Sequence, residues 1–196
     1  MNTASQIDTT VLIVGGGPVG MTMALCLAKR GIASYLVELR SAETLPDVKC
    51  NHISSRSMEL FRSLGISQDL RAAGLPDEYP HDVSYRTSTL GEEIARIHIP
   101  GRNTRLTDHS GPDGNWPTPE PPHRINQRYI EPILRRHVQK QTLITCLYRH
   151  QVLSFTQDEN QVTAQIQNLD QSDSQALTLS AAYNTETINH ICKNQW

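Results

Sequence analysis

The stretch VLIVGGGPVG, from Val11 to Gly20, decides the fold of this 196-residue chain. It overlaps a β-branched and apolar run, Thr10 to Val14, that is typical of a strand buried on both faces of a parallel sheet. Pro18 then stands where a helix can begin, because the first turn of a helix tolerates a missing N–H. A strand, a glycine turn and a helix are therefore expected in this order.

The residues that follow complete the same unit. The segment from Met21 to Arg30 predicts a helix, which Gly31 ends in the manner of a C-cap. ASYLVE, from Ala33 to Glu38, predicts a second short strand. Strand, helix and strand form one βαβ unit, and the predicted fold class is therefore α/β.

The spacing of three glycines in this unit indicates a nucleotide-binding turn. Gly15-x-Gly17-x-x-Gly20 follows a strand and opens a helix, the context that the dinucleotide fingerprint requires. Gly15 permits the tight turn, Gly17 lets the backbone approach a pyrophosphate, and Gly20 lets helix and strand pack closely. The helix begins at Pro18, and N–H groups around Val19 and Gly20 would face the phosphate with the helix dipole behind them. These five residues are candidate cofactor contacts.

An acidic residue at the end of the second strand narrows the choice of nucleotide. Glu38 lies 18 positions after Gly20, and its carboxylate would accept hydrogen bonds from a ribose 2′-OH and repel a 2′-phosphate. The adenosine half of the ligand should therefore not be that of NADP. Arg40 is expected to be a solvated charge. The alternative is that the glycines only shape a turn, and these features alone do not distinguish NAD from FAD.

Beyond this unit, local patterns predict further helices and strands. Amphipathic spacing and caps predict helices, and period-two alternation predicts strands. Helices are expected over Ile53–Leu64, Ser67–Ala73 (capped by Ser67) and Ile125–Gln139. An antiparallel pair of strands is expected over Asp82–Thr89 and Glu93–Ile99. Three further β-like runs cover Thr142–Phe155, Gln161–Gln167 and Ala176–Ala182. Between them, Gly101–His123 is rich in Gly, Pro and Asp, and is either disordered or a lid or binding loop.

Composition excludes several classes of partner. A net charge of −2 gives no reason to expect nucleic acid or an anionic membrane. The uncharged run from Val11 to Ala28 is broken by glycines and a proline and follows no basic segment, so neither a signal peptide nor a membrane span is expected.

Scattered cysteines indicate reduced thiols in a cytoplasmic protein. No metal is expected, since Asp108, His109, Asp113 and His123 lack ligand spacing.

Three blocks of sequence together resemble one protein family. VLIVGGGPVGMTMALCLAKRGIASYLVE, KCNHISSRSMELFRSLGI and RINQRYIEPILRRHV are similar to the N-terminal part of FAD-dependent aromatic hydroxylases, the p-hydroxybenzoate and phenol hydroxylase class. The resemblance runs from about Asp8 to Ala182 and implies a Rossmann-like FAD-binding domain with an inserted antiparallel β-sheet layer. It also implies FAD as cofactor, NAD(P)H and O2 as co-substrates, and hydroxylation of an aromatic or phenolic small molecule.

The resemblance also assigns individual residues. Gly15, Gly17 and Gly20 match the family's ADP-binding turn, and Glu38 matches its ribose acid. Lys49 falls where relatives often place an arginine near the flavin pyrophosphate; lysine keeps the charge and loses the bidentate geometry. The alternative for Lys49 is a solvated loop lysine.

Two further positions bear on the flavin and on catalysis. Gln127 matches a glutamine that in relatives hydrogen-bonds the ribityl or ring side of the flavin, and its alternative is a helix N-cap. Phenol hydroxylase relatives carry an aspartate base where this chain has Asn51, which cannot act as a base. The catalytic residue is therefore unknown.

The end of the chain departs from the family pattern. The strand LTLSAAY is expected to begin the return to the FAD sheet, but the glycine-aspartate motif that follows it in relatives does not come. We therefore expect an FAD-binding domain over 1–183, incomplete at the C-terminus, with partial substrate-domain strands (82–99), a β-meander (142–182) and an atypical, disordered tail (184–196). The alternative to a monooxygenase is an inactive nucleotide-binding remnant, whose partner would be a missing C-terminal half or a second copy of the chain.

Overall fold

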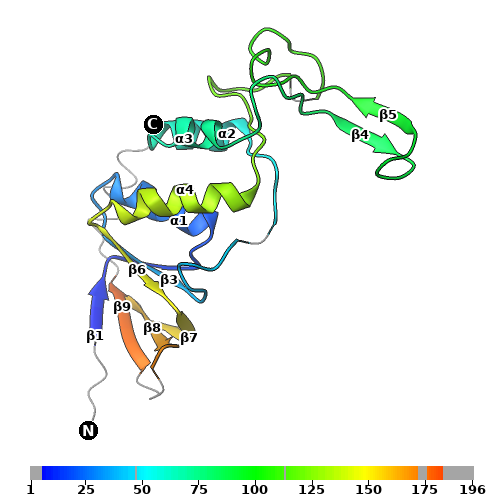
Figure 1. Ribbon diagram of the computed structural model, residues 1–196. Helices are drawn as coiled ribbons and strands as arrows, with labels where there is room; N and C mark the ends of the chain where they lie inside the picture. Colours follow the sequence, from blue (N-terminus) through cyan, green and yellow to red (C-terminus); the bar gives the residue numbers. More distant parts are fainter. Residues whose placement is uncertain (1–5, 47, 113, 172–175, 183–196) are drawn as a thin grey trace. The chain divides into compact units, whose positions relative to one another are not determined.

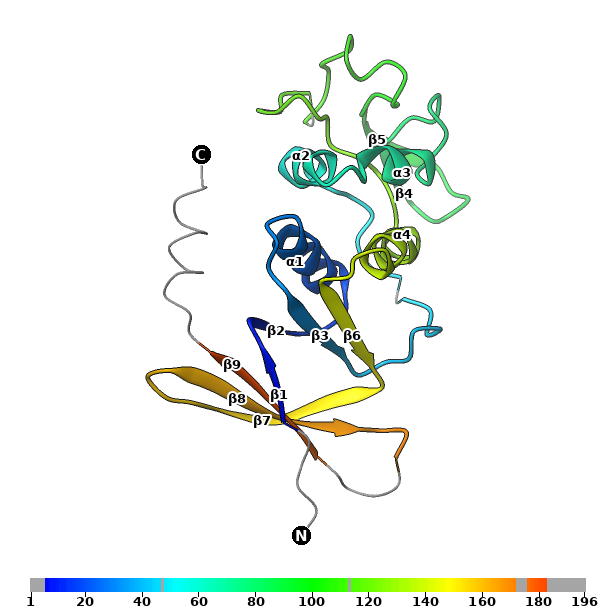
Figure 2. The same ribbon diagram turned by 90° about the vertical axis from the view of Figure 1, so that its left-hand side faces the viewer.

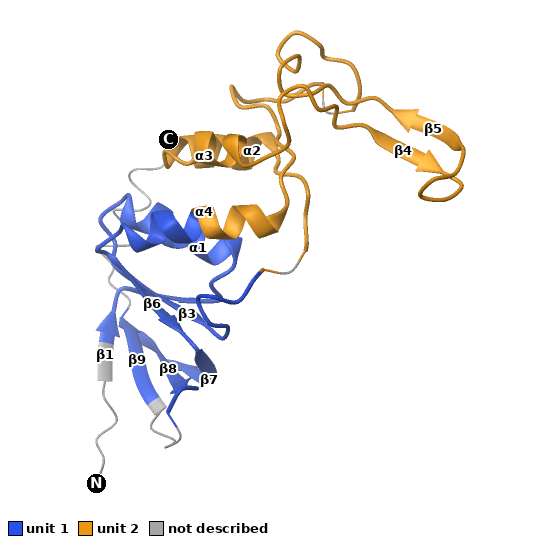
Figure 3. Ribbon diagram, viewed as in Figure 1, with its two compact units in different colours: residues 1–45, 134–196 blue, residues 46–133 orange. Residues whose placement is uncertain are grey.

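The computed structural model describes residues 6–46, 48–112, 114–171 and 176–182. The chain divides into two compact units (Figure 3), one formed by residues 1–45 and 134–196 and the other by residues 46–133. The predicted tail over 184–196 lies outside the described residues, as do Asp113 and Cys192. Within the described part of the chain, no helix has the length and apolar character needed to cross a membrane.

The first unit contains the predicted βαβ motif. Strands β2 (Val11–Val14), β3 (Ser34–Glu38) and β6 (Ile144–Tyr148) form a parallel sheet in the order β2-β3-β6. Helix α1 (Pro18–Ala28) connects β2 to β3 and contacts both strands (Figure 1). Because strand side chains alternate between faces, Leu36 and Val37 on β3 point to opposite faces of the sheet, and both are buried.

A second sheet covers the face to which Val37 points. Its order is β1-β9-β8-β7 (Figure 2), where β1 (Gln6–Thr9) and β9 (Ala176–Ala182) are parallel and the other neighbours are antiparallel. Strands β8 (Gln161–Asn168) and β7 (His150–Gln157) complete it. A core cluster joins the two sheets and consists of Val37, Ala164, Ile166 and Leu179. Strand β1 has no counterpart among the strands predicted from the sequence.

The prediction of one β-like run over Thr142–Phe155 is wrong. The run divides at Arg149, whose φ of 57° places it in the left-handed region, and strands β6 and β7 on either side belong to different sheets. The Arg149 N–H donates to the carbonyl of Arg40 at 3.2 Å, and its carbonyl accepts from Leu169 at 2.8 Å. The sequence here is Arg149, His150 and Gln151, without the glycine, proline or asparagine that usually signals a turn. The antiparallel meander therefore begins at His150 and not at residue 142.

The second unit is built on two short helices and the start of a third. Helix α2 (Ser55–Ser63) begins after Ser54, whose hydroxyl accepts from the N–H of Ser57. Helix α3 (Ser67–Ala72) is preceded by Ile66 as N-cap, so the predicted capping role of Ser67 is wrong. Helix α4 (Gln127–Gln139) starts in this unit and continues into the first. The buried apolar residues of the unit include Met58, Phe61, Ile66 and Leu70.

The remaining elements of this unit are a hairpin and a long connection. Strands β4 (Val83–Arg86) and β5 (Glu93–Ile97) pair antiparallel as predicted, but all of their residues are exposed. In the connection between β5 and α4, Glu120 forms an ion pair with Arg71 of α3 in which both side chains are largely buried. Arg71 also donates to the carbonyl of Pro121. These contacts tie the end of the connection to α3.

Arg149 offers a test of the left-handed turn between β6 and β7. Its ion pair with Asp170 is exposed and contributes little, so the backbone conformation should dominate. Arg149→Gly should be about 1 kcal/mol more stable than Arg149→Ala, because a Cβ in the left-handed region costs roughly that much, and Arg149→Val should be the least stable. Denaturant unfolding of the full chain measures the order, and equal stability of the three variants would contradict the assigned turn.

Candidate nucleotide-binding site

The predicted glycine turn lies between β2 and α1. Gly15 has a φ of 104°, which favours glycine, and its N–H donates to the carbonyl of Val37 at 2.8 Å. Gly17 is the N-cap of α1, and no side chain caps the helix start. Its carbonyl accepts from Met21 at 3.0 Å, the first bond of the helix. The turn therefore leads directly from the end of β2 into an uncapped helix N-terminus.

Each glycine of the turn has a distinct steric environment. A Cβ on Gly20 would clash with the carbonyl of Gly15 and lie 3.3 Å from the side chain of Ile13, which agrees with the packing role predicted for Gly20. A Cβ on Gly17 would meet nothing within 4 Å, so the space in front of this residue is open to a ligand. A Cβ on Gly16 would lie 2.9 Å from Cβ of Glu38. The dinucleotide fingerprint does not include Gly16, and the run of three consecutive glycines is the signal in the sequence that points to it.

Glu38 is buried at the end of β3 and is held by three hydrogen bonds. Its Oε2 accepts from the N–H of Gly16 at 2.6 Å, and its Oε1 accepts from the N–H and Nε of Arg40 at 2.9 and 3.0 Å. Burial alone would raise the pKa of Glu38, but the hydrogen bonds from Arg40 and Gly16 outweigh it and hold the pKa below its usual range. Arg40 is thus an ion-pair partner of Glu38 and not the solvated charge that was expected.

These features fit the adenosine diphosphate part of a dinucleotide. The helix N-terminus carries a partial positive charge and free N–H groups point outward from the first turn of a helix, which suits a pyrophosphate. A carboxylate offers roughly four acceptor positions, and three hydrogen bonds to Glu38 leave room for a ribose hydroxyl. Pro18 and Val19 form the first turn, and Val19 is 84% exposed.

The other two predicted cofactor residues, Lys49 and Gln127, lie in the second unit and are neighbours there. The N–H of Gln127 lies 3.2 Å from the carbonyl of Lys49 and 3.3 Å from that of Cys50. The side-chain amide of Gln127 donates to Glu131 at 2.6 Å. Gln127 is the first residue of α4 and not its cap. The cap is Asn126, whose side-chain oxygen accepts a hydrogen bond from the N–H of Arg128.

Lys49 and Gln127 belong to a short antiparallel ladder that the sequence did not predict. Ile53 and His123 exchange backbone hydrogen bonds at 2.8 and 2.9 Å, and the N–H of Ile125 donates to the carbonyl of Asn51 at 3.2 Å. We refer to residues 49–53 and 123–127, joined in this way, as the 49–127 ladder. It brings the segment before α2 beside the segment before α4.

His123, one of the residues considered for a metal, has a structural environment. Its side chain is buried, and Nε2 lies 2.9 Å from the carbonyl of Leu70. A carbonyl only accepts, so Nε2 carries the proton. His109 contacts the ring of Trp116, and Asp108 accepts from the N–H of Ser110. Within the described ranges, His, Cys, Asp and Glu side chains form no group of three that could hold a metal.

Comparisons with known proteins find extensive similarity. A family model described as an FAD binding domain matches residues 8–184. Phenol 2-monooxygenase from Pseudomonas sp. (strain EST1001) is 31% identical over 184 residues, which are 93% of this chain and 29% of that protein. The chain therefore spans less than a third of the length of this curated relative.

Solved structures give the same result. The rebeccamycin biosynthetic enzyme RebC with reduced flavin superposes with a TM-score of 0.75 at 33% identity, over 91% of this chain and 32% of that one. The flavin-dependent monooxygenase PieE, in complex with FAD and substrate, superposes with a TM-score of 0.76 at 28% identity, over 92% of this chain and 30% of that one.

The steric environments of Gly20 and Gly17 predict opposite results for the same substitution. Gly20→Ala should destabilise the protein by about 1–3 kcal/mol or more, because the new Cβ overlaps backbone of the turn. Gly17→Ala should change stability by no more than about 1 kcal/mol, the difference between glycine and alanine as N-cap. Thermal and denaturant unfolding compare the two. Equal effects would mean that the turn does not have this geometry.

His123 predicts a dependence of stability on pH. Burial lowers the pKa of His123 from 6.5 to about 4, although the bond to Leu70 opposes the shift. Between these values the unfolded chain binds a proton that the folded chain does not, so stability should fall as pH falls from 6.5 to 4. In His123→Gln, which cannot titrate, the loss over this range should be smaller. Unfolding curves at several pH values measure the difference, and parallel curves for both proteins would refute it.

Proposed function

We propose, since this chain belongs to the FAD-binding domain family, that it binds the adenosine diphosphate part of FAD at the turn between β2 and α1. The observation that carries this proposal is the joint arrangement of the turn and Glu38. The uncapped N-terminus of α1 lies beside open space at Gly17, and the acid at the end of β3 is held ionised by Gly16 and Arg40. One feature suits a pyrophosphate and the other suits a ribose hydroxyl.

In this proposal each residue has a defined task. The N–H groups of the first turn of α1 bind the pyrophosphate, and Gly15, Gly17 and Gly20 keep the backbone close enough to do so. Pro18 and Val19 belong to this first helical turn. Glu38 accepts a ribose hydroxyl, and Arg40 keeps its carboxylate oriented. In the second unit, Lys49 supplies positive charge for the phosphates, and Gln127 hydrogen-bonds the flavin half.

The wider proposal concerns the reaction of the whole protein. We infer a monooxygenase that hydroxylates an aromatic or phenolic small molecule, with one oxygen atom of O2 entering the ring and the other leaving as water. FAD, when bound, supplies the transfer of two electrons from NAD(P)H to O2. The reaction would take place in the cytoplasm, in keeping with the free thiols of Cys26, Cys50 and Cys146. Support comes from the relatives, among them a phenol 2-monooxygenase and a flavin-dependent monooxygenase solved with FAD and substrate.

An alternative is a nucleotide-binding domain that lacks activity until a partner polypeptide or a second copy completes it. An apolar pocket of about 270 Å³ in the first unit favours it, since Val14 and Phe155 at this pocket are 65% and 69% exposed. Apolar side chains exposed together often mark a surface that another polypeptide covers.

Titration of the purified full chain with FAD tests the proposed site. We expect saturable binding, seen as a change in flavin absorbance and fluorescence, and at least tenfold weaker binding for Glu38→Gln, since a charge-assisted hydrogen bond contributes about 1.5–3 kcal/mol. Gly17→Ala should also weaken binding while stability changes little. Glu43→Gln, at an exposed acid of the same unit, is the matched control and should bind as the unaltered chain does.

The titration, together with a measurement of NAD(P)H oxidation on the same samples, has four informative outcomes. Absence of FAD binding by a folded chain would refute the proposed site. Loss of affinity in the Glu43 control equal to that of Glu38→Gln would refute the role of Glu38. NAD(P)H oxidation stimulated by a phenolic compound would support the monooxygenase, whereas FAD binding without such oxidation would favour the inactive alternative.

A further inference from the structure

Glu131 is a buried acid to which the proposed function gives no task. It lies on α4 and is 0% exposed. Three residues close to it on the helix, Ile130, Ile133 and Leu134, are apolar and buried as well. A carboxyl group is costly to remove from water and is almost never fully buried unless it is paired. A buried acid of this kind indicates a task for the contact that it makes.

One contact joins Glu131 to Gln127, one turn earlier on the same helix. The amide Nε2 of Gln127 donates to Oε1 of Glu131 at 2.6 Å, as side chains four residues apart on a helix can. A carboxylate only accepts hydrogen bonds, so the NH2 group of the amide is the end that faces it. The carbonyl oxygen of the planar amide is then turned away from Glu131. Gln127 is therefore set to offer a hydrogen-bond acceptor to a ligand.

The backbone of Gln127 is held by separate contacts. Its N–H lies 3.2 Å from the carbonyl of Lys49 and 3.3 Å from that of Cys50, at one end of the 49–127 ladder. The ladder thus sets the position of the residue, and Glu131 sets which end of its amide faces outward. A glutamine at position 131 could present either end of its own amide and would allow both orientations of Gln127. A glutamate allows only one.

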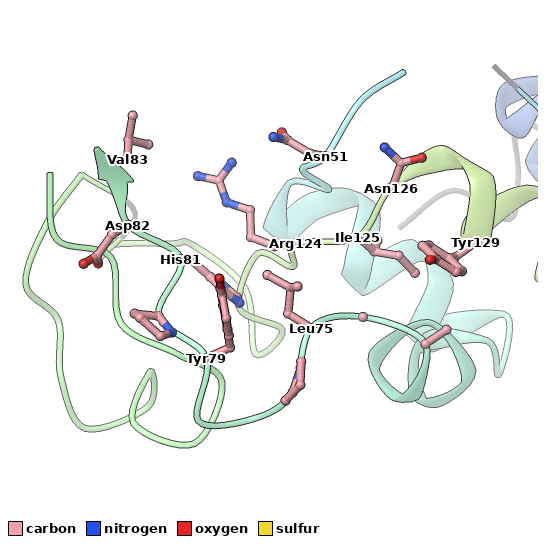
Figure 4. A pocket seen from close by; sticks show the side chains of 14 residues that line it. Asn51, Leu75, Tyr79, His81, Asp82, Val83, Arg124, Ile125, Asn126 and Tyr129 are labelled. Atoms are coloured by element: carbon pink, nitrogen blue, oxygen red, sulfur yellow. The ribbon is translucent and has the colours of Figure 1, made fainter. Parts of the chain in front are cut away.

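The pair of Gln127 and Glu131 is separate from the pocket of the second unit. That pocket has a volume of about 510 Å³, and Figure 4 shows Asn51, Asn126 and Tyr129 among the side chains around it. Neither Gln127 nor Glu131 lines it. A substitution of Glu131 therefore replaces no side chain of the pocket lining.

We propose that Glu131 is a positioning residue for the flavin, which holds the amide of Gln127 so that its carbonyl oxygen accepts a hydrogen bond from the flavin half of FAD. The inference rests on the proposed function, in which Gln127 contacts that half. Donors on the flavin half are the hydroxyls of the ribityl chain and the N3–H of the ring, and both suit such an acceptor. A hydrogen bond to a carboxylate is roughly twice as strong as one between neutral groups, so the acid holds the amide more firmly than a second amide would.

Titrations of the full chain with FAD and with ADP test the proposal, since ADP lacks the flavin half. Glu131→Gln, which keeps the size of the side chain, should bind FAD about fivefold more weakly or worse, because the outward acceptor is no longer fixed. Its affinity for ADP should stay within about twofold of that of the unaltered chain, whereas a damaged fold would weaken both ligands alike. Glu78→Gln, at an exposed acid of the same unit, is the matched control and should change neither affinity.

Gln127→Ala keeps the test valid if Glu131→Gln impairs folding. It removes the acceptor itself and should also weaken binding of FAD but not of ADP. In this background Glu131→Gln should cause no further loss, because a positioning residue acts through the residue that it holds. An FAD analogue methylated at N3 identifies the donor. The effect of Glu131→Gln should disappear with this analogue if the ring N–H is the donor and persist if a ribityl hydroxyl is.

Several outcomes would overturn the role of Glu131 and leave the proposed adenosine diphosphate site in place. These are unchanged FAD binding by Glu131→Gln or by Gln127→Ala, equal weakening of FAD and ADP by Glu131→Gln, and a further loss in the double variant. Absence of binding of both FAD and ADP by the folded, unaltered chain would refute the proposed site itself, and the role of Glu131 with it.

Discussion

The hydrogen bond from Gly16 to Glu38 is the constraint on which the candidate nucleotide site depends. At 2.6 Å it joins the turn after β2 to the end of β3, and it exists only because Gly16 has no Cβ to separate them. It places the carboxylate beside the turn that leads into α1, and together with the bonds from Arg40 it keeps the pKa of Glu38 low against the effect of burial. One short backbone-to-side-chain bond thus joins the two halves of the site, the turn before the helix N-terminus and the acid.

The parts of the fold that could be predicted are those that local sequence encodes. The strand–turn–helix–strand order follows from β-branched residues, glycine spacing and the cap at Gly31, and the structure has it within a few residues. Amphipathic spacing located α2 and α4 equally well. The family inferred from three sequence blocks is confirmed by the match over residues 8–184. Each of these signals lies within one segment and needs no knowledge of distant contacts.

The missed features arise from contacts between distant segments or from unusual backbone. Arg149 adopts a left-handed conformation without being glycine, so no residue typical of a turn marked the change of sheet between β6 and β7. Strand β1 exists through its parallel pairing with β9, some 170 residues away in sequence. The ion pair of Arg40 and the 49–127 ladder are likewise tertiary contacts. Asn126 was missed as the cap of α4 because the predicted helix begins two residues too early, at Ile125.

The ladder also links the proposed cofactor residues to the pocket within the second unit. Lys49 and Gln127, proposed for the cofactor, are joined at one end of it. Asn51 and Arg124, which line the pocket of about 510 Å³, lie next along the same two segments. Cys50, between Lys49 and Asn51, has a φ of 50°, a conformation that costs energy in a residue other than glycine and that the surrounding bonds maintain. A displacement of either segment would therefore move a proposed cofactor residue and a wall of this pocket together.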